Sequence, residues 1–488
     1  MDRTEYWKII ARNGVTLLIL TLFTFVAVMQ YNLIPSIYDY IEAEYGLDTP
    51  TPLMLLEAIV VFIGAGMAVV WAYYYDKTSR KGVLKISLSI WVCGCLISAF
   101  ANVYWLFIMG RLLTAIGIGA HFPLSYGIMA DIVPSIHWST LAGFLSVVSS
   151  FGNGFAQFLS SFFTPLDIWG LSWHFPFLLI AIISAATFSL IFFMKLPSRG
   201  ASSFEELDPE LGKKMREGHV QYDFKIKRED VLKLWRIPTN RRLMLSAFFI
   251  VIPTAALNSF LIYYMVQGPF ISLPDAFRTQ IATIFSAMVV IGYFLGVIIL
   301  GPIIDKIHEK RPKIRGKLSY WGLAIAMPLL MVSFVFIVPI DYAVLDLPYG
   351  AGDTEFNLLM YYEICEAIFL KYPLYVPYFF TAFLGSFCAA PMVINQNPIL
   401  LEINLPEHQG TSQALVYLGN QISKGATYVL LAFQYVLFAG IDLRIIFIVS
   451  LLFYLPPIIW WRRVCKSESI DKRKKMIILQ DRKEKLKN

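Results

Sequence analysis

Long apolar runs recur along the chain and are separated by short polar segments. A helix needs about 20 mainly apolar residues to cross the hydrocarbon core of a bilayer. Runs of about this length lie at residues 13–36, 52–75, 82–102, 105–131, 140–163, 172–194, 242–267, 276–303, 318–340, 374–401, 411–437 and 441–461. Six precede the polar stretch 195–241 and six follow it. The pattern predicts an all-α integral membrane protein with twelve transmembrane helices in two groups of six.

Lysine and arginine are distributed unevenly among the connecting segments. Residues 195–242 carry twelve of them, 304–317 six and 76–81 three, whereas 37–51 carry none and 341–373 only Lys371. When the spans are alternated across the bilayer, the basic segments all fall on one side. Because cytoplasmic connections are enriched in Lys and Arg, we expect both termini and the linker to be cytoplasmic and the protein to lie in the cell membrane.

These boundaries divide the chain into four parts. They are an N-terminal six-helix bundle at 1–194, a cytoplasmic linker at 195–241, a C-terminal six-helix bundle at 242–463 and a basic cytoplasmic tail at 464–488. The outer loop 341–373 interrupts the second bundle, and its apolar stretch 356–372 could form an interfacial helix. The tail is expected to be a helical or disordered extension near lipid headgroups. The first run lacks the short apolar core and cleavage site of a signal peptide, which indicates an uncleaved helix.

The composition agrees with the membrane class and excludes several others. The 488 residues are 57% hydrophobic and 15% charged, whereas soluble domains carry about 25% charged residues. The net charge of +7 lies in loops and tail, so it does not indicate nucleic-acid binding. The five cysteines are scattered and form no disulfide or metal pattern. The sequence contains no phosphate-binding glycine loop and no catalytic or metal spacing. We therefore expect no cofactor, no enzyme activity and a monomer.

The fourth run carries charged and polar residues at membrane depth. Arg111 and His121 lie within it, and a charge at the bilayer centre costs roughly 2.5–3.5 kcal/mol on insertion scales. Such side chains therefore face a bundle interior or a wet cavity. Gly117 and Gly119 would let another helix approach closely, and Pro123 predicts a kink. The run is expected to line a pathway.

Polar residues at similar depth in other runs complete a candidate substrate site. The full set is Gln30, Tyr31, Asn32, Arg111, His121, Asn153, Gln157, Asn258, Tyr263, Asn395, Asn420 and Lys424. Its two fixed charges, Arg111 and Lys424, are both cationic, and Glu57 is the one clear carboxylate within a span. This bias favours an anionic substrate. The alternative is that Arg111 pairs with a carbonyl or carboxylate and is purely structural.

The two halves of the sequence repeat each other. Asp76 ends the second span and Asp305 the eighth, each followed by several bases. Asp131 and Glu402 end the fourth and tenth spans in the same way. Parallel six-helix repeats are typical of secondary transporters and predict bundles in a pseudo-twofold arrangement. We expect gating by Asp76, Arg80, Lys81, Asp131, Asp305, Lys310 and Glu402, with Asp305 pairing with Lys306 or Lys310. Exposed ion pairs contribute about 0–1 kcal/mol, enough to bias two conformations.

Here the sequence resembles the major facilitator superfamily over essentially its whole length. That family's loop signature after the second helix is matched by Ala72, Asp76, Ser79 and the pair Arg80–Lys81. Its fourth-helix signature is matched loosely by Arg111, Gly117 and Gly119. Residues 115–131 resemble phosphate and metabolite:proton symporters, whereas 173–179 and 195–207 resemble the spinster and anion-transporter branches. The resemblance implies that helices 1, 4, 7 and 10 line a cavity flanked by helices 5, 8 and 11.

His121 departs from the symporter pattern, in which the matching residue is usually Asp or Glu. A histidine, whose ordinary pKa is about 6.5, could still support proton coupling. Equally, it could be a packing residue.

The leading hypothesis is a secondary active transporter that moves a small anionic organic or inorganic solute by alternating access, with proton coupling open. A spinster-like transporter of an amphiphile, such as a lysolipid, is the main alternative, and a non-transporting membrane sensor is less favoured. The expected partners are the small-molecule substrate, protons if transport is coupled, and membrane lipids, but not nucleic acid.

Overall fold

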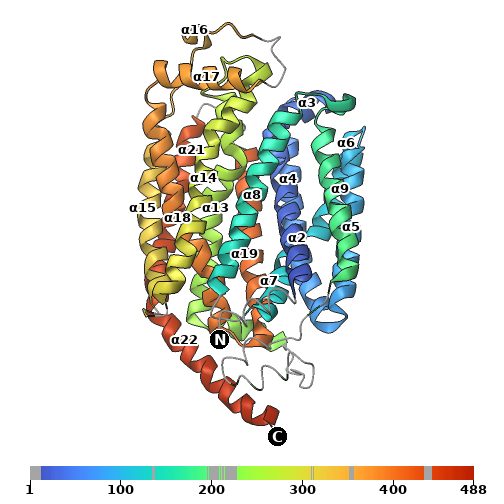
Figure 1. Cartoon of the computed structure of the whole chain (residues 1–488), viewed down its shortest axis with the longest axis vertical. Helices are drawn as coiled ribbons and strands as arrows, with labels where there is room; N and C mark the ends of the chain where they lie inside the picture. Colours follow the sequence, from blue (N-terminus) through green and yellow to red (C-terminus); the bar gives the residue numbers. More distant parts are fainter. Residues whose placement is uncertain are drawn as a thin grey trace.

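A computed structural model describes residues 13–133, 138–194, 228–308, 313–350, 357–433 and 442–487, together with 196, 208, 210, 214, 310 and 311. Within these ranges every regular element is helical. The chain folds into two bundles of long helices that run side by side (Figure 1). The expected all-α class with twelve membrane-spanning segments is confirmed.

The first six expected runs correspond to helices of the N-terminal bundle. These are α2 (Gly14–Asn32), α4 (Thr51–Lys77), α5 (Arg80–Ala99), the pair α6 (Tyr104–Ile118) and α7 (His121–Ile132), α8 (Trp138–Phe163) and α9 (His174–Leu190). Short elements extend or connect them: η1 (Ile34–Ser36), α3 (Tyr38–Tyr45), η3 (Ile168–Gly170) and η4 (Ile191–Phe193).

The remaining runs correspond to helices of the C-terminal bundle. These are α13 (Pro238–Gln267), α14 (Asp275–His308), α15 (Ile314–Phe336), α18 (Tyr375–Ile403), α19 (Pro406–Ala432) and α21 (Leu443–Leu451), which continues through η5 (Leu452–Tyr454) into α22 (Leu455–Lys487). Short helices outside the spans are α12 (Arg228–Arg236), α16 (Tyr342–Leu345) and α17 (Leu358–Lys371). Most of the predicted linker lies outside the described residues, and α12 is its one described helix.

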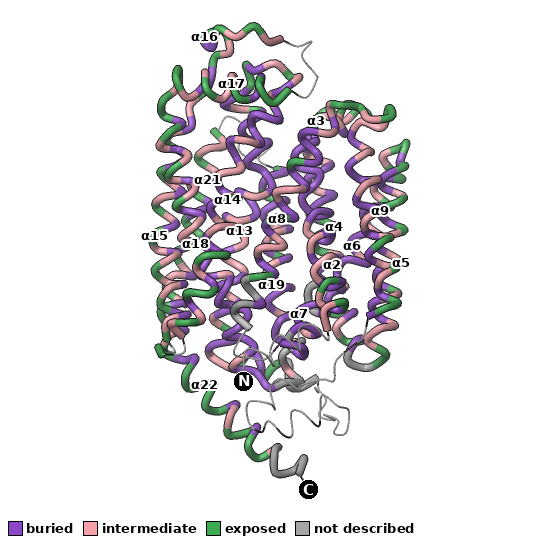
Figure 2. The backbone as a smooth tube through the Cα atoms, in the orientation of Figure 1, coloured by how far each residue is buried: buried purple, intermediate pink, exposed green. Residues whose placement is uncertain are grey.

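In the described part of the chain, nine helices are long and apolar enough to cross a membrane. The other three expected spans are the divided pair α6 and α7, and the more polar or partly described helices α8 and α19. Buried residues concentrate where the bundles meet, and exposed residues lie on the outward faces of α5, α9 and α15 (Figure 2). Many exposed side chains are large and apolar, among them Ile86, Ile182, Trp321 and Val335. Apolar outward faces are expected of a protein surrounded by lipid.

The molecule has two distinct ends. We call the end that carries α3, α16 and α17 the acidic end. The opposite end carries the tail helix α22 (Figure 1). The connection from α4 to α5, where α5 begins with Arg80 and Lys81, lies at this end, and we call it the basic end.

Glycines bring the helices of the N-terminal bundle close together around α6 and α7. A Cβ atom on Gly117 would lie 2.5 Å from the Cβ of Trp91 on α5, and one on Gly119 would lie 2.6 Å from the carbonyl oxygen of Gly64 on α4. The expected close approach is therefore confirmed. The helix is interrupted between α6 and α7, at residues 119–120. Pro123 cannot donate a backbone hydrogen bond to the carbonyl of Gly119, which accounts for a break four residues before the proline.

The tail is helical and packs against the basic end of the C-terminal bundle. Its buried positions Ser467, Asp471 and Lys475 recur every four residues along α22. The Lys475 ammonium donates to the carbonyl oxygen of Leu401 at 2.9 Å, and the Asp471 carboxylate accepts from the backbone N–H of Thr239 at 3.2 Å. Of the two expected states of the tail, helical and disordered, the structure shows the helix.

Candidate functional site

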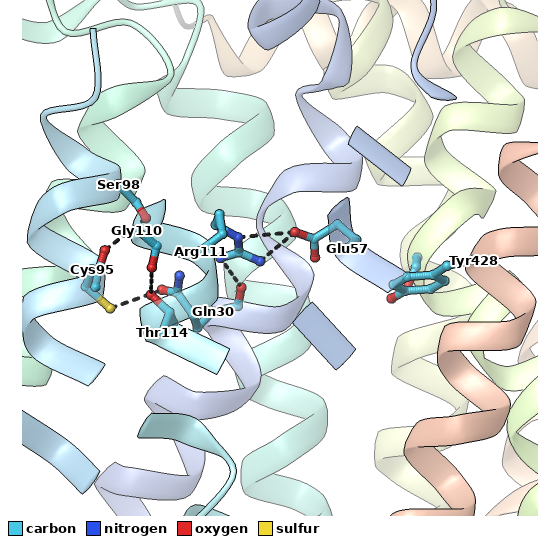
Figure 3. A network of polar contacts seen from close by, with 10 residues as sticks. Gln30, Glu57, Cys95, Ser98, Gly110, Arg111, Thr114 and Tyr428 are labelled. Carbon is cyan, nitrogen blue, oxygen red and sulfur yellow. Dashed lines mark hydrogen bonds and ion pairs between the residues drawn. The ribbon is translucent and has the colours of Figure 1, made fainter. Parts of the chain in front are cut away.

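Arg111 forms an ion pair inside the N-terminal bundle. Its side chain on α6 is fully buried, and Nη2 lies 2.6 Å from Oε1 of Glu57 on α4. Nε donates to the same oxygen at 3.2 Å, and Nη1 donates to the backbone carbonyl of Gln30 on α2 at 3.4 Å (Figure 3). One guanidinium therefore ties three helices together. This is the structural alternative of the sequence analysis, since Glu57 already compensates the charge of Arg111.

The second carboxylate oxygen of Glu57 is not the one that pairs with Arg111. Oε2 is buried, and no donor in the described ranges bonds to it. The Nε2 atom of Gln30, close by, is also buried without an acceptor among those residues, although Oε1 accepts a weak bond from the thiol of Cys95 at 3.6 Å. Buried polar atoms are nearly always hydrogen-bonded in proteins. Unsatisfied atoms beside an ion pair therefore indicate a place for a ligand or water.

Lys424 lies where the two bundles meet. It is partly buried on α19, and Nζ is 5.1 Å from the ring centroid of Tyr31 on α2 and 5.4 Å from that of Tyr428. The hydroxyl of Tyr428 in turn shares a 2.7 Å hydrogen bond with that of Ser259 on α13. Ring faces attract cations at such distances. No carboxylate of the described segments pairs with Lys424, but Nζ lies within electrostatic range of both Glu57 and Arg111.

Other predicted site residues also meet at this interface. Gln157 on α8 donates to the backbone carbonyl of Asn258 on α13 at 2.6 Å and to the side chain of Asn153 at 3.4 Å. Asn420, one turn from Lys424, has a buried Oδ1 that accepts no hydrogen bond from the described residues. The structure thus brings Tyr31, Asn153, Gln157, Asn258, Asn420 and Lys424 to the surfaces along which the bundles face each other.

Three other predicted site residues contact residues of their own bundle instead. Asn32 donates to the carbonyl of Val28 within its own helix at 2.8 Å. Asn395 donates to the carbonyl of Arg315 at 3.2 Å and to the hydroxyl of Ser319 at 3.1 Å, within the C-terminal bundle. His121 is buried at the start of α7, with its ring edge-on to that of Phe23 at 5.5 Å. Because α7 follows α6 toward the basic end, His121 lies on a different level from Arg111.

The bundles touch at the acidic end. The ring of Tyr38 on α3 lies 5.9 Å from that of Tyr263 and 6.4 Å from that of Phe260, both on α13. Gln267 donates to the carboxylate of Asp39 at 3.1 Å. Beside them, burial and the negative charge of Asp39 raise the pKa of Glu42 to about 7.

They also touch at the basic end. The hydroxyl of Tyr126 on α7 interacts with the side chain of Asn397 on α18. Val147 on α8 packs against Val297 and Ile394 of the other bundle. The site residues therefore lie between two contact zones, one at each end.

The predicted gating residues of the first half are only partly brought together. Arg80 pairs with Asp131 at 3.3 Å, as expected. Lys81 instead donates to the carbonyls of Phe192 and Met194 at 2.7 and 3.1 Å, where it caps the end of η4. The side chain of Asp76 lies outside the described part of the structure.

In the second half the partner of the acids differs from the expected one. Asp305 pairs with Arg315 at 3.1 Å, and Glu402 pairs with the same guanidinium and with Lys472 of the tail at 2.9 Å. The two expected partners, Lys306 and Lys310, are both exposed. Arg315 could have been found in the sequence, since it begins the ninth span as Arg80 begins the third. Each of these ion pairs links elements of a single bundle, so they brace the ends of the bundles.

Twelve helices in two bundles, with polar side chains along the interface between them, define a membrane transporter. The profile of the Major Facilitator Superfamily matches residues 19–354, and the chain belongs to this family. The Gallate transporter of Pseudomonas putida is 32% identical over 147 residues, which cover 30% of this chain and 31% of that protein. The chain spans between 23% and 34% of the length of the curated relatives it matches.

Two solved structures share the fold over nearly the whole chain. The human organic anion transporter MFSD10 superimposes with a TM-score of 0.59 at 16% identity, covering 92% of this chain and 99% of that one. A bacterial homologue of the human lysosomal transporter Spinster, in an inward-facing and unoccupied conformation, has a TM-score of 0.55 at 16% identity, with coverages of 94% and 98%. At these identities the likeness shows the fold alone.

Proposed function

We propose that this transporter moves a small anionic solute by alternating access and that Lys424 binds the negative charge of the solute. The observation that carries the proposal is the position of Lys424. It belongs to the C-terminal bundle, faces Tyr31 of the N-terminal bundle and has no carboxylate partner in the described ranges. Arg111 is neutralised by Glu57, so the cation available to a substrate is Lys424.

The geometry suits a site that both bundles close around. A solute bound at Lys424 would contact α19 of one bundle and α2 of the other through Tyr31. Rocking of one bundle against the other would then expose the same residues first to one side and then to the other. The amide side chains of Asn420 and Gln157 supply polar contacts nearby.

The remaining parts of the proposal concern sidedness and coupling. The Lys and Arg count supports a cytoplasmic basic end, and we propose a monomer in the cell membrane. His121 is the group that would link transport to protons, because it is the titratable side chain of the expected pathway helix with a pKa ordinarily near neutrality. One relative by name, the Gallate transporter of Pseudomonas putida, moves an organic anion.

Uptake into proteoliposomes tests the proposal. Labelled organic and inorganic anions are offered with and without an imposed pH gradient, and the wild type is compared with Lys424→Gln. Loss of a charge-assisted hydrogen bond costs about 1.5–3 kcal/mol. We therefore expect affinity to fall about 10- to 100-fold, with reduced sensitivity to salt. Lys474→Gln, an exposed position on α22, is the matched control. If Lys424→Gln transports anions at wild-type affinity, the role given to Lys424 is wrong. If the wild type takes up none of the anions offered, the anion proposal fails and transport of an amphiphile becomes the better hypothesis.

A further inference from the structure

We infer that Glu57 sets the substrate site to one net positive charge, so that the site selects monovalent over divalent anions. The inference rests on the proposed function and adds to it the valence of the solute. It follows from the arrangement at membrane depth in which the ion pair of Arg111 and Glu57 faces Tyr428 across the interface, with Lys424 beside the ring of Tyr428 (Figure 3).

The charge count is simple because the other titratable side chains of the described residues that interact with this cluster are phenols and the thiol of Cys95, which are neutral. From α2 the site receives Tyr31, from α3 Tyr38 and from α19 Tyr417 and Tyr428. Phenols stay uncharged near neutral pH, since their ordinary pKa is about 10. Two cations and one carboxylate therefore leave a single positive charge. Figure 3 shows Glu57 between Arg111 on one side and Tyr428, across the interface, on the other.

The net charge of the site affects which anions it binds because the site is buried. A net charge at membrane depth is costly, and opposite charges attract more strongly there than in water. A bound monovalent anion brings the total to zero, whereas a divalent anion leaves a net negative charge beside the carboxylate of Glu57. The buried Oε2 of Glu57 has no donor among the described residues, so its charge is only partly satisfied by Arg111. The carboxylate would therefore repel a second negative charge on the solute.

The test varies the net charge and measures valence preference. Matched probes are benzoate with terephthalate and butyrate with succinate, and the readout is the ratio of their apparent affinities in competition for uptake at low salt. Glu57→Gln gives a site of two positive charges, and its preference should shift toward the dianions by about tenfold or more. The double variant Glu57→Gln with Arg111→Gln has one positive charge again, and its preference should return to that of the wild type.

A second variant tests the same inference in case Glu57→Gln does not fold. Glu57→Gln leaves the buried Arg111 without its partner, which can destabilise the protein. Asn420→Lys leaves that ion pair intact and adds a positive charge one helical turn from Lys424. It should shift the preference toward dianions in the same direction. Size-exclusion profiles and melting temperatures identify the folded variants.

The outcomes separate the two proposals. If the wild type takes up anions but valence preference stays constant in the folded Glu57→Gln and Asn420→Lys variants, the charge inference is wrong and the anion proposal stands. The same holds if the double variant keeps a shift toward dianions. If the wild type takes up none of these four anions and none of the organic and inorganic anions of the first experiment, the anion proposal fails, and the charge inference fails with it.

Discussion

Glu42, at the acidic end, carries a carboxyl group that folding removes in part from water. Burial, and after it the negative charge of Asp39, raises its pKa from about 4.5 to about 7, and its Oε1 is buried without a donor among the described residues. The folded protein therefore binds this proton more tightly than the unfolded chain does. Its stability should fall as pH rises from about 4.5 to about 7 and then level off.

The substitution Glu42→Gln should remove this loss of stability at higher pH. We expect the variant to melt at a higher temperature than the wild type at pH 8 and at about the same temperature at pH 5. Because the Glu42 carboxyl group is partly exposed, the gain in the free energy of unfolding should be at most about 1 kcal/mol. Glu366→Gln, at an exposed position on α17, is the control. A melting difference that is the same at both pH values would show that the carboxyl group of Glu42 does not titrate in this window.

Some properties of individual residues could be predicted from the sequence, and others could not. It could place Arg111, Glu57 and Lys424 at membrane depth because charges are rare within apolar runs. It could not determine which of them pair, since that depends on how α4 and α6 are rotated about their axes. Residues with local partners, such as Asn32 and Asn395, look the same in a sequence as residues that face an interface. The partner of Asp305 was missed for a different reason. Arg315 lies beyond the connecting loop, on the first turn of α15, and the parallel with Arg80 on the first turn of α5 could have identified it.

At the scale of helices, the contact between α5 and α6 depends on small residues. A Cβ on Gly117 would lie 2.5 Å from the backbone carbonyl oxygen of Ser87 and equally close to Trp91. Backbone atoms cannot move aside without shifting a helix. Gly117→Ala should therefore destabilise the protein by about 1–3 kcal/mol, seen as a lower melting temperature in detergent.

Gly127 provides a matched control within the same transmembrane segment. A Cβ there would meet nothing within 4 Å, and alanine is the better helix former. Gly127→Ala should be neutral or slightly stabilising. Equal losses at the two positions would mean that the close approach of α5 and α6 is not what limits stability.

Apolar length predicted the helices well, and every expected span corresponds to one helix or to two or three consecutive helices. It predicted the ends less well, because polar first turns, such as that of α13 from Pro238, continue a helix beyond the apolar run. The packing of α22 against the C-terminal bundle could not be predicted from the sequence either. Its basic composition suggested lipid headgroups, whereas the contacts of Asp471 and Lys475 depend on tertiary structure.

At the scale of the whole molecule, the bundles make contact at both ends of the interface. Asp39 and Gln267 are in contact at the acidic end, and Tyr126 and Asn397 at the basic end. In alternating access, one contact zone must open while the other stays closed, and each must open once per cycle. The internal repeat predicted the two bundles, but the contacts between them join residues at least about a hundred positions apart, such as Gln157 and Asn258, and required the structure.

Cross-linking tests this requirement at each end separately. In a background without the five native cysteines, cysteines replace Asp39 and Gln267 in one variant and Tyr126 and Asn397 in another. A short bifunctional thiol reagent should abolish uptake in both double variants and leave each of the four single-cysteine variants active. Either cross-link should block a full cycle, because a solute that enters at one end must leave at the other. Uptake that persists after complete cross-linking at one end would show that this contact need not open, and alternating access between these bundles would then be the wrong mechanism.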